Sequence, residues 1–315
     1  MEGKRVVLVT GCDLADQAVN MLRDFDVVYA GRQPTEDRLV SLCEQHNPVA
    51  ILVRYGRITA RIMDAAPALQ VISKHGSGID VIDQPAAAAR DIAVRSAPGA
   101  NAAAVAEHTW ALILACAKSV VTLDKRLRDG HWDKATHKSI ELDGMTLGLI
   151  GLGAIGSRVA QVGQAFGMQV VAYDPYAKTM PSGCERANTL PDLLSRADVI
   201  SLHCPLTDDN RGMINADTLK YCKRNAILVN TARGGLINDE ALLHALKDGT
   251  LHSAALDSFT SEPLTAPHIW QTVDNVIISP HIGGVSAASY IKMGTVAASN
   301  ILDVIRVTDG ATVSP

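Results

Sequence analysis

The stretch MTLGLIGLGAIGSRVAQVGQAFGMQVVAYD, residues 145–174, decides the fold of this chain. Its apolar run at 145–150 predicts a buried strand, and the residues from about 155 to 167 predict a helix. A second apolar run at 168–173 predicts another strand, which ends at Asp174. Three glycines fill the turn before the helix, at positions 151, 153 and 156. This order and spacing are typical of a βαβ unit that binds a dinucleotide.

Each glycine of the turn has a physical reason. Gly151 allows the tight turn, Gly153 lets the backbone approach a pyrophosphate, and Gly156 lets the helix pack close to the strand. The free N–H groups and the positive dipole end of the helix then face the phosphates. Ala154 and Ile155, which open the helix, complete the expected phosphate contacts.

Asp174 lies eighteen residues past Gly156, at the end of the second strand. A carboxylate there accepts both hydroxyls of an adenosine ribose and repels a 2′-phosphate, so the sequence favours NAD over NADP. By itself, an aspartate before Pro175 is equally typical of an ordinary strand-end turn. The glycine turn beside it favours the nucleotide.

Composition bounds the remaining possibilities. The 315 residues are enough for two domains, and 47% hydrophobic with 20% charged residues is ordinary for a globular protein. A net charge of -4 predicts no affinity for nucleic acid or membrane surfaces. The most apolar stretch, residues 110–121, is too short to span a membrane. The start of the chain runs straight into a strand pattern, so we expect no signal peptide.

The six cysteines are scattered and none has CxxC spacing. This pattern predicts neither a zinc site nor a disulfide framework, and we expect no bound metal. It fits a reducing cytoplasm.

Strand and helix patterns alternate on both sides of the nucleotide motif, which predicts α/β architecture with parallel, doubly wound sheets. Before the motif we expect strands at 5–10, 27–29, 50–53, 69–73 and 92–95, with helices at 14–22, 36–46 and 59–66. After it, further strands are expected at 198–203, 226–230, 253–256 and 276–278. An alanine-rich helix at 102–118 suggests close packing between the domains or against a second subunit. A last helix, 287–306, is placed to return to the first domain.

Three titratable residues follow successive strands of the nucleotide domain: Arg233, Glu262 and His281. Each alone is compatible with a capping arginine, a turn glutamate or a loop histidine. Together, at one sheet edge, they favour a reaction site. A histidine near pKa 7 moves the proton that accompanies hydride transfer, and a carboxylate beside it raises its pKa. An arginine binds a substrate carboxylate and polarises the adjacent carbonyl, which indicates 2-hydroxy or 2-oxo acid chemistry.

Seven motifs in order resemble the D-isomer-specific 2-hydroxyacid dehydrogenase family, which includes phosphoglycerate, glycerate and D-lactate dehydrogenases. They are KHGSGID (74–80), PGANAAAVAEH (98–108), GLGAIG (151–156), LHCPLT (202–207), NTARGG (230–235), ALDSFTSEP (255–263) and SPHIGG (279–284). The resemblance covers essentially the whole chain. It implies a Rossmann NAD-binding domain at 97–286, inserted in a discontinuous flavodoxin-like substrate domain formed by 1–96 and 287–315. It also implies a homodimer joined through the NAD-binding domains.

The resemblance further implies residue roles. His281 is the proton donor and acceptor, Glu262 its partner, and Arg233 the anchor of the substrate carboxylate and carbonyl. Arg233 and His281 are also among the implied cofactor contacts. The others are Cys204, Pro205, Thr231, Ala232, Asp257 and Gly283, with Asp257 holding the nicotinamide carboxamide. The backbone around Ser77 and Gly78 would cradle the substrate carboxylate, with Asn101 nearby.

The sequence says less about which 2-hydroxy or 2-oxo acid is the substrate. Arg54 and Arg57, with Lys74 and His75, add positive charge after strands of the first domain. This charge suits a second anionic group on the substrate, as in 3-phosphoglycerate, although surface arginines often bind nothing. Glycerate and hydroxypyruvate stay open as substrates. Because the chain ends at Pro315, we expect no serine-sensing regulatory domain.

Two alternatives stay open. One is formate-type oxidation, which is disfavoured because that branch resembles a glutamine–histidine pair and this chain has Glu262. The other is an NAD-sensing corepressor-like protein, which predicts an exposed apolar peptide groove on the N-terminal domain.

Overall fold

The chain forms two units, each built on one parallel sheet. The computed structural model describes residues 4–311. The chain passes from unit 1 to unit 2 between Asn101 and Ala102, and it returns to unit 1 between Gly284 and Val285. Unit 2 is therefore inserted in unit 1. These crossings lie five and two residues from the expected domain boundaries, and residues 1–3 and 312–315 of the expected substrate domain lie outside the described residues.

Unit 1 contains a five-stranded sheet in the order β2-β1-β3-β4-β5, in which every pairing is parallel. This is the flavodoxin-like strand order. Its strands are β1 (Val6–Val9), β2 (Asp26–Tyr29), β3 (Ala50–Val53), β4 (Val71–Lys74) and β5 (Ala93–Arg95). Its helices are α1 (Asp16–Met21), α2 (Glu36–His46), α3 (Ala60–Asp64), α4 (Gln84–Ala88) and α11 (Ala287–Ala311).

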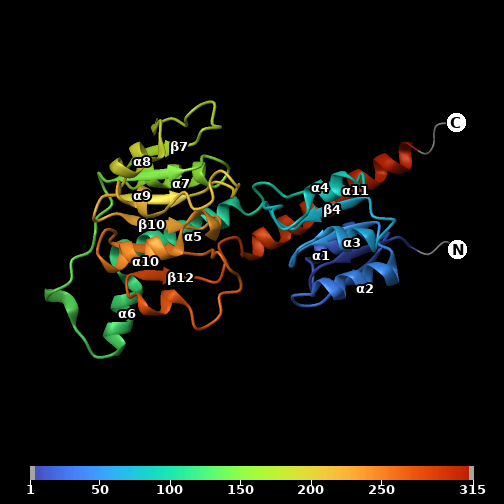
Figure 1. The fold of residues 1–315 in the computed structure, drawn as a ribbon, viewed down its shortest axis with the longest axis horizontal. Helices are drawn as coiled ribbons and strands as arrows, with labels where there is room; N and C mark the ends of the chain where they lie inside the picture. Colours follow the sequence, from blue (N-terminus) through green and yellow to red (C-terminus); the bar gives the residue numbers. More distant parts are fainter. Residues whose placement is uncertain (1–3, 312–315) are drawn as a thin grey trace. The chain divides into compact units, whose positions relative to one another are not determined.

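Helices cover both faces of this sheet (Figure 1). One core contains the buried side of α2 and α3, and the other contains α1 and the last helix, α11. Ala297, Ala298 and Ile301 of α11 are fully buried in the second core. The last helix therefore returns to unit 1 because its small and branched residues complete a face that the first hundred residues leave open.

Unit 2 contains a seven-stranded sheet in the order β12-β11-β10-β9-β6-β7-β8, again with parallel pairings only. Its strands are β6 (Thr146–Ile150), β7 (Gln169–Tyr173), β8 (Cys184–Arg186), β9 (Val199–Leu202), β10 (Ile227–Asn230), β11 (Ser253–Leu256) and β12 (Val276–Ile278). Its helices are α5 (Ala102–Lys118), α6 (Val120–Arg128), α7 (Gly156–Ala165), α8 (Leu190–Arg196), α9 (Ala216–Leu219) and α10 (Asp239–Lys247). Three short 3₁₀ helices lie at Asp133–Ala135, Gly234–Leu236 and Ile269–Thr272.

The strands of unit 2 are apolar throughout because both faces of the sheet are covered. On β10, Ile227 and Val229 face the core beneath α5 and α7, whereas Leu228 faces the opposite core with α8, α9 and α10. The strand order is that of a Rossmann sheet with one added strand. The predicted α/β class, with two doubly wound parallel sheets, is confirmed.

Strand β8 was not predicted from the sequence, because it has three residues and two of them are exposed. Helix α5 packs against α7, β10 and β11 of its own unit. The expected packing between the domains or against a second subunit stays a prediction.

Helix α5 ends at Lys118, and Ser119 takes a left-handed backbone conformation before α6 begins. Helix α6 buries no residue, and it lies away from the sheet of unit 2 (Figure 1). No single helix of the described chain is long and apolar enough to cross a membrane. The bent pair α5–α6 passes only a test of length and composition.

Candidate active site

The glycine turn after β6 has the geometry that phosphate binding requires. Gly151 has a φ of +97°, and a Cβ there would lie 2.8 Å from the backbone of Cys204. A Cβ on Gly156 would lie 2.2 Å from the carbonyl oxygen of Gly151. A Cβ on Gly153 would meet nothing within 4 Å, so this position faces open space. The first and last glycines thus serve the fold, and the middle one leaves room for a ligand at the start of α7.

Asp174 lies directly beside this turn. Its Oδ2 accepts a hydrogen bond from the Leu152 amide at 2.8 Å, and its Oδ1 accepts from the amides of Tyr176 and Ala177. The carboxylate is half-buried at the end of β7. It therefore holds the glycine turn and places a negative charge next to it.

Cys204 and Pro205 follow β9, the neighbour of β6 on the other side of the glycine turn. Burial raises the pKa of the Cys204 thiol to about 11, so the thiol is neutral at physiological pH. The Pro205 carbonyl accepts a hydrogen bond from Asn210 at 2.7 Å. This loop therefore presents an uncharged surface beside Gly151, at the switch point where the strand order reverses.

Glu262 and His281 are in direct contact. Nδ1 of His281 lies 2.7 Å from Oε2 of Glu262, and Oε1 of Glu262 accepts a hydrogen bond from the Phe259 amide at 2.9 Å. A carboxylate only accepts, so Nδ1 donates. The other ring nitrogen, Nε2, is left to exchange a proton with a substrate.

The electrostatics of this pair include Arg233. The hydrogen bond to Glu262 is the largest effect on His281 and raises its pKa, while burial and the charge of Arg233 act against it. Burial acts to raise the pKa of Glu262, but hydrogen bonds from His281 and Phe259 outweigh it, and the pKa is lowered. In unit 2, Arg233, Glu262 and His281 therefore influence one another electrostatically. Glu262 stays ionised to a lower pH than an ordinary glutamate, and His281 stays protonated to a higher pH than an ordinary histidine.

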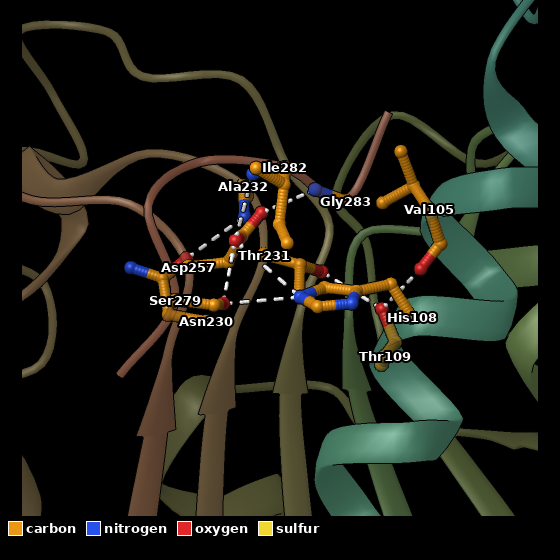
Figure 2. Close-up of polar contacts among 10 residues, drawn as sticks. All are labelled: Val105, His108, Thr109, Asn230, Thr231, Ala232, Asp257, Ser279, Ile282 and Gly283. Carbon is orange, nitrogen blue, oxygen red and sulfur yellow. Dashed lines mark hydrogen bonds and ion pairs between the residues drawn. The ribbon is translucent and has the colours of Figure 1, made fainter. Parts of the chain in front are cut away.

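The backbone of His281 is in the left-handed region, with a φ of +54°. Asp257 stabilises this loop, because its oxygens accept hydrogen bonds from Ser279 Oγ at 2.6 Å, the Ile282 amide at 3.0 Å and the Gly283 amide at 2.8 Å (Figure 2). The carboxylate is 1% exposed. A Cβ on Gly283 would lie 2.9 Å from Asp257 Oδ2, so the close approach requires glycine.

This arrangement adds a role for Asp257 that the sequence did not indicate. The expected contact with a carboxamide stays a prediction, whereas the structure engages both oxygens with the loop that carries His281. Gly283 is likewise buried and donates to Asp257.

Asn230, which is fully buried at the end of β10, stabilises the loop that carries Arg233. Its side chain accepts a hydrogen bond from the Ala232 amide at 3.0 Å and donates to the Arg233 carbonyl at 2.9 Å. The Thr231 hydroxyl lies 2.8 Å from that of Thr109 on α5 (Figure 2). Sequence reasoning missed Asn230; a polar residue ending an apolar strand was the available signal.

In unit 1, Ser77 and Asn101 lie together, with Ser77 Oγ 3.4 Å from Asn101 Oδ1 and 3.3 Å from the Ala97 carbonyl. Gly78 follows Ser77 on the loop after β4. Lys74 ends β4 and donates from Nζ to the Arg54 carbonyl at 3.0 Å. These four predicted substrate residues therefore belong to one edge of the unit 1 sheet.

Arg54 lies after β3, where the strand order of unit 1 reverses. Its guanidinium forms an ion pair with Asp13 and donates to the Asp13 carbonyl at 2.7 Å. It also stacks between the rings of Tyr55 and Tyr290, at 5.2 and 5.0 Å. The Arg54 side chain is 11% exposed. Much of its charge is thus compensated within the protein.

His75 adds no positive charge at neutral pH, contrary to the expectation for this edge. Burial, followed by the charge of Arg54, lowers its pKa to about 4. Its ring lies 5.4 Å from that of Tyr290. Arg57 is exposed.

Two further features bear on cofactors. Among residues 4–306, whose side chains the structure describes, no group of three His, Cys, Asp or Glu side chains is placed to hold a metal ion. The six cysteines, all of which lie in this range, are free thiols.

Comparison with known proteins decides the family. Residues 110–283 match the family described as D-isomer specific 2-hydroxyacid dehydrogenase, NAD binding domain. The chain belongs to this family. The domain with the glycine turn and Asp174 is therefore an NAD-binding domain, and NAD is its cofactor.

Three relatives are representative. The chain is 39% identical to D-3-phosphoglycerate dehydrogenase of Methanocaldococcus jannaschii, over 95% of this chain and 57% of that protein. It is 37% identical to glyoxylate reductase of Aeropyrum pernix, over 89% of this chain and 86% of that protein. The crystal structure of the TT0316 protein from Thermus thermophilus superposes with a TM-score of 0.88 at 38% identity, covering 96% of this chain and 97% of that chain. The chain thus spans little more than half the length of the phosphoglycerate dehydrogenase.

Proposed function

We propose that this protein is an NAD-dependent oxidoreductase that interconverts a D-2-hydroxy acid and its 2-oxo acid. The observation that carries the proposal is the 2.7 Å contact between His281 Nδ1 and Glu262 Oε2, with Arg233 close enough to influence the His281 pKa. Family membership supports it. NAD, when bound, would supply or accept the hydride.

The residues of the chain divide the remaining work. Nε2 of His281 gives a proton to the substrate oxygen during reduction and removes it during oxidation. Glu262 fixes the ring and favours its charged form. Arg233 binds the substrate carboxylate and polarises the adjacent carbonyl. In unit 1, the proposal assigns Ser77, Gly78, Asn101 and Lys74 to substrate binding.

The cofactor contacts follow from the glycine turn. Gly151, Gly153 and the start of α7, with Ala154, Ile155 and Gly156, bind the pyrophosphate, and Asp174 binds the adenosine ribose. The open space at Gly153 and the carboxylate beside Leu152 support this assignment. We assign Cys204 and Pro205 to the adenosine side, and Thr231, Ala232, Asp257 and Gly283 to the nicotinamide side.

The substrate belongs to one of two groups. Phosphoglycerate and other doubly anionic acids need free positive charge, whereas glycerate, hydroxypyruvate or glyoxylate do not. The ion pair of Arg54 with Asp13 and the neutral His75 favour the second group. Both groups appear among the names of the relatives.

The test is a panel of 2-oxo acids with NADH: glyoxylate, hydroxypyruvate, phosphohydroxypyruvate, sulfopyruvate, phenylpyruvate and oxaloacetate. We expect turnover with at least one member, and a D-configured product wherever the 2-hydroxy acid formed is chiral. Absence of NADH oxidation with every member, by protein that binds NADH, contradicts the proposal. The two relatives above are named as a dehydrogenase and a reductase, so they do not favour the corepressor-like or formate-type alternatives.

We also propose a homodimer joined through unit 2. Helix α6 and the segment after it expose large apolar side chains, namely Val120, Val121, Leu127 and Trp132, and a second copy of the chain is the occupant that we propose for them. Light scattering should give twice the mass of the 33.4 kDa chain, and Leu127→Asp should give the monomer. A monomeric wild type contradicts the dimer. For the compartment we propose the cytoplasm, where the six thiols stay reduced.

A further inference from the structure

Two adjacent residues of α5, His108 and Thr109, reach two different loops of the candidate site. Nε2 of His108 lies 3.0 Å from Ser279 Oγ, on the loop after β12. Oγ1 of Thr109 lies 2.8 Å from Thr231 Oγ1, on the loop after β10 (Figure 2). One turn of one helix therefore contacts both loops.

The hydrogen bonds have a defined direction. Thr109 donates to the Val105 carbonyl at 2.8 Å, so its oxygen accepts from Thr231. Ser279 donates to Asp257 Oδ1 at 2.6 Å, because an ionised carboxylate only accepts. Ser279 Oγ is then left to accept from Nε2–H of His108. His108 thus contacts Asp257 through Ser279, and its Nε2 also lies 3.4 Å from Asp257 Oδ1.

Each anchor lies two residues before a reacting group. Thr231 precedes Arg233, and Ser279 precedes His281. Thr109, Thr231 and Asp257 are buried, and His108 is partly buried. A hydrogen bond made away from water is costly to leave unmade, so these contacts resist displacement. The strained backbone of His281 needs such support.

We propose that His108 and Thr109 are positioning residues that together set the spacing between the Arg233 guanidinium and the His281 imidazole. His108 acts on the imidazole through Ser279 and Asp257, and Thr109 acts on the guanidinium through Thr231. This inference rests on the proposed function of Arg233 and His281. It differs from simple helix–sheet packing because it assigns a separate kinetic effect to each residue.

Steady-state kinetics test whether His108 and Thr109 have separate effects on kcat and KM. His108→Ala should lower kcat by about 10-fold or more, since a displacement of about 1 Å at the reacting centre costs as much as 100-fold. Thr109→Val should chiefly raise KM for the 2-oxo acid, because it displaces the carboxylate anchor. His108→Gln and Thr109→Ser keep a donor and a hydroxyl, and each should restore most of the loss. Glu107→Gln, an exposed change on the same helix, is the matched control and should match wild type.

A second readout is independent of turnover. The pKa of His281, followed by NMR through its imidazole protons and assigned with His281→Asn, should fall toward the ordinary value of 6.5 in His108→Ala. The pKa of His281 should be unchanged in Thr109→Val. If wild type turns over no 2-oxo acid, the proposed function fails, yet this titration still tests the positioning of the ring.

Ser279→Ala removes the other partner of the hydrogen bond between His108 and Ser279. It is the alternative variant if His108→Ala does not fold. The double variant His108→Ala/Ser279→Ala should lose little more than Ser279→Ala alone, because both changes remove the hydrogen bond between His108 and Ser279. An unchanged kcat and His281 pKa in both His108→Ala and Ser279→Ala overturns the proposal, as does an equal loss in Glu107→Gln.

Discussion

The carboxylate of Glu262 and the imidazole of His281 share one hydrogen bond, although they come from loops after different strands, β11 and β12. Each partner shifts the other toward its charged form: the pKa of His281 is raised and that of Glu262 is lowered. The protein therefore keeps a proton available on His281 above pH 6.5, the ordinary value for histidine.

This pairing predicts a pH profile. Reduction of a 2-oxo acid needs protonated His281, so its rate should fall as pH rises through the raised pKa. In Glu262→Gln the hydrogen bond to a charge is lost, and the fall should move to lower pH. Measuring kcat/KM for reduction against pH in both proteins checks it. Superimposable profiles would exclude Glu262 as the partner that sets the His281 pKa.

The same pair predicts how stability depends on pH. A raised His281 pKa contributes stability that is complete below 6.5, the unfolded value, and is lost as pH rises through the folded pKa. A lowered Glu262 pKa contributes stability that is complete above 4.5 and is lost as pH falls through the folded pKa. Urea unfolding should therefore separate wild type from Glu262→Gln more at about pH 5.5 than at about pH 9. Equal differences at the two pH values would count against the pair.

Replacing His281 should abolish proton transfer without removing cofactor binding. His281→Asn is the better variant than His281→Ala, because asparagine tolerates the left-handed backbone at a φ of +54°. We expect turnover to fall by about 10²- to 10⁴-fold. NADH binding, measured by fluorescence, should stay close to wild type. A variant that retains most of its turnover would mean that another group moves the proton.

The glycine turn predicts two opposite outcomes for the same substitution. Gly151→Ala puts a Cβ at positive φ and 2.8 Å from the Cys204 backbone, so it should destabilise the fold by about 1–3 kcal/mol. Gly153→Ala meets no protein atom within 4 Å, so its free energy of unfolding should stay within about 0.5 kcal/mol of wild type. Its affinity for NADH should nevertheless fall, because the Cβ occupies the space assigned to the pyrophosphate. Intact NADH affinity in Gly153→Ala would remove this position from the phosphate site.

Asp174 should decide between the two cofactors. Asp174→Asn keeps one oxygen, which can accept from Leu152, but loses the acceptor for Tyr176 and Ala177 and removes the charge that repels a 2′-phosphate. We expect the ratio of NADPH to NADH affinity to rise by at least about 10-fold, since like charges in contact cost several kcal/mol. Dissociation constants for both cofactors, before and after the change, provide the check. A constant ratio would show that Asp174 only holds the turn.

The Arg54–Asp13 ion pair predicts a gain of specificity. Asp13→Asn removes the negative charge that compensates the guanidinium of Arg54, so kcat/KM for phosphohydroxypyruvate should rise relative to hydroxypyruvate by about 10-fold, the value of one charge-assisted hydrogen bond. In the double variant Asp13→Asn/Arg54→Met, that gain should be lost. Asp16→Asn, an exposed carboxylate on α1, is the control. An unchanged substrate ratio in Asp13→Asn would show that Arg54 does not face the substrate.

Local pattern was sufficient for the fold class and the family. The apolar runs, the glycine turn and the spacing to Asp174 are properties of neighbouring residues, and they predicted both parallel sheets. The short strand β8 was not predicted, because three residues with two exposed side chains carry no periodic signal. The domain boundaries were predicted only to within five residues. The grouping of Arg233, Glu262 and His281 was foreseeable for the same reason as the sheet: the carboxyl ends of parallel strands share one edge.

The amino-acid sequence by itself determined which residues are chemically able to act, and where along the strands they stand. Only the tertiary structure decided which of their charges are already satisfied. Asp13 takes up Arg54, burial removes the charge of His75, and Asp257 turns inward to hold the His281 loop. Hydrogen bonds and desolvation act over a few ångströms between residues far apart in the chain, so these outcomes exist only once the chain has folded.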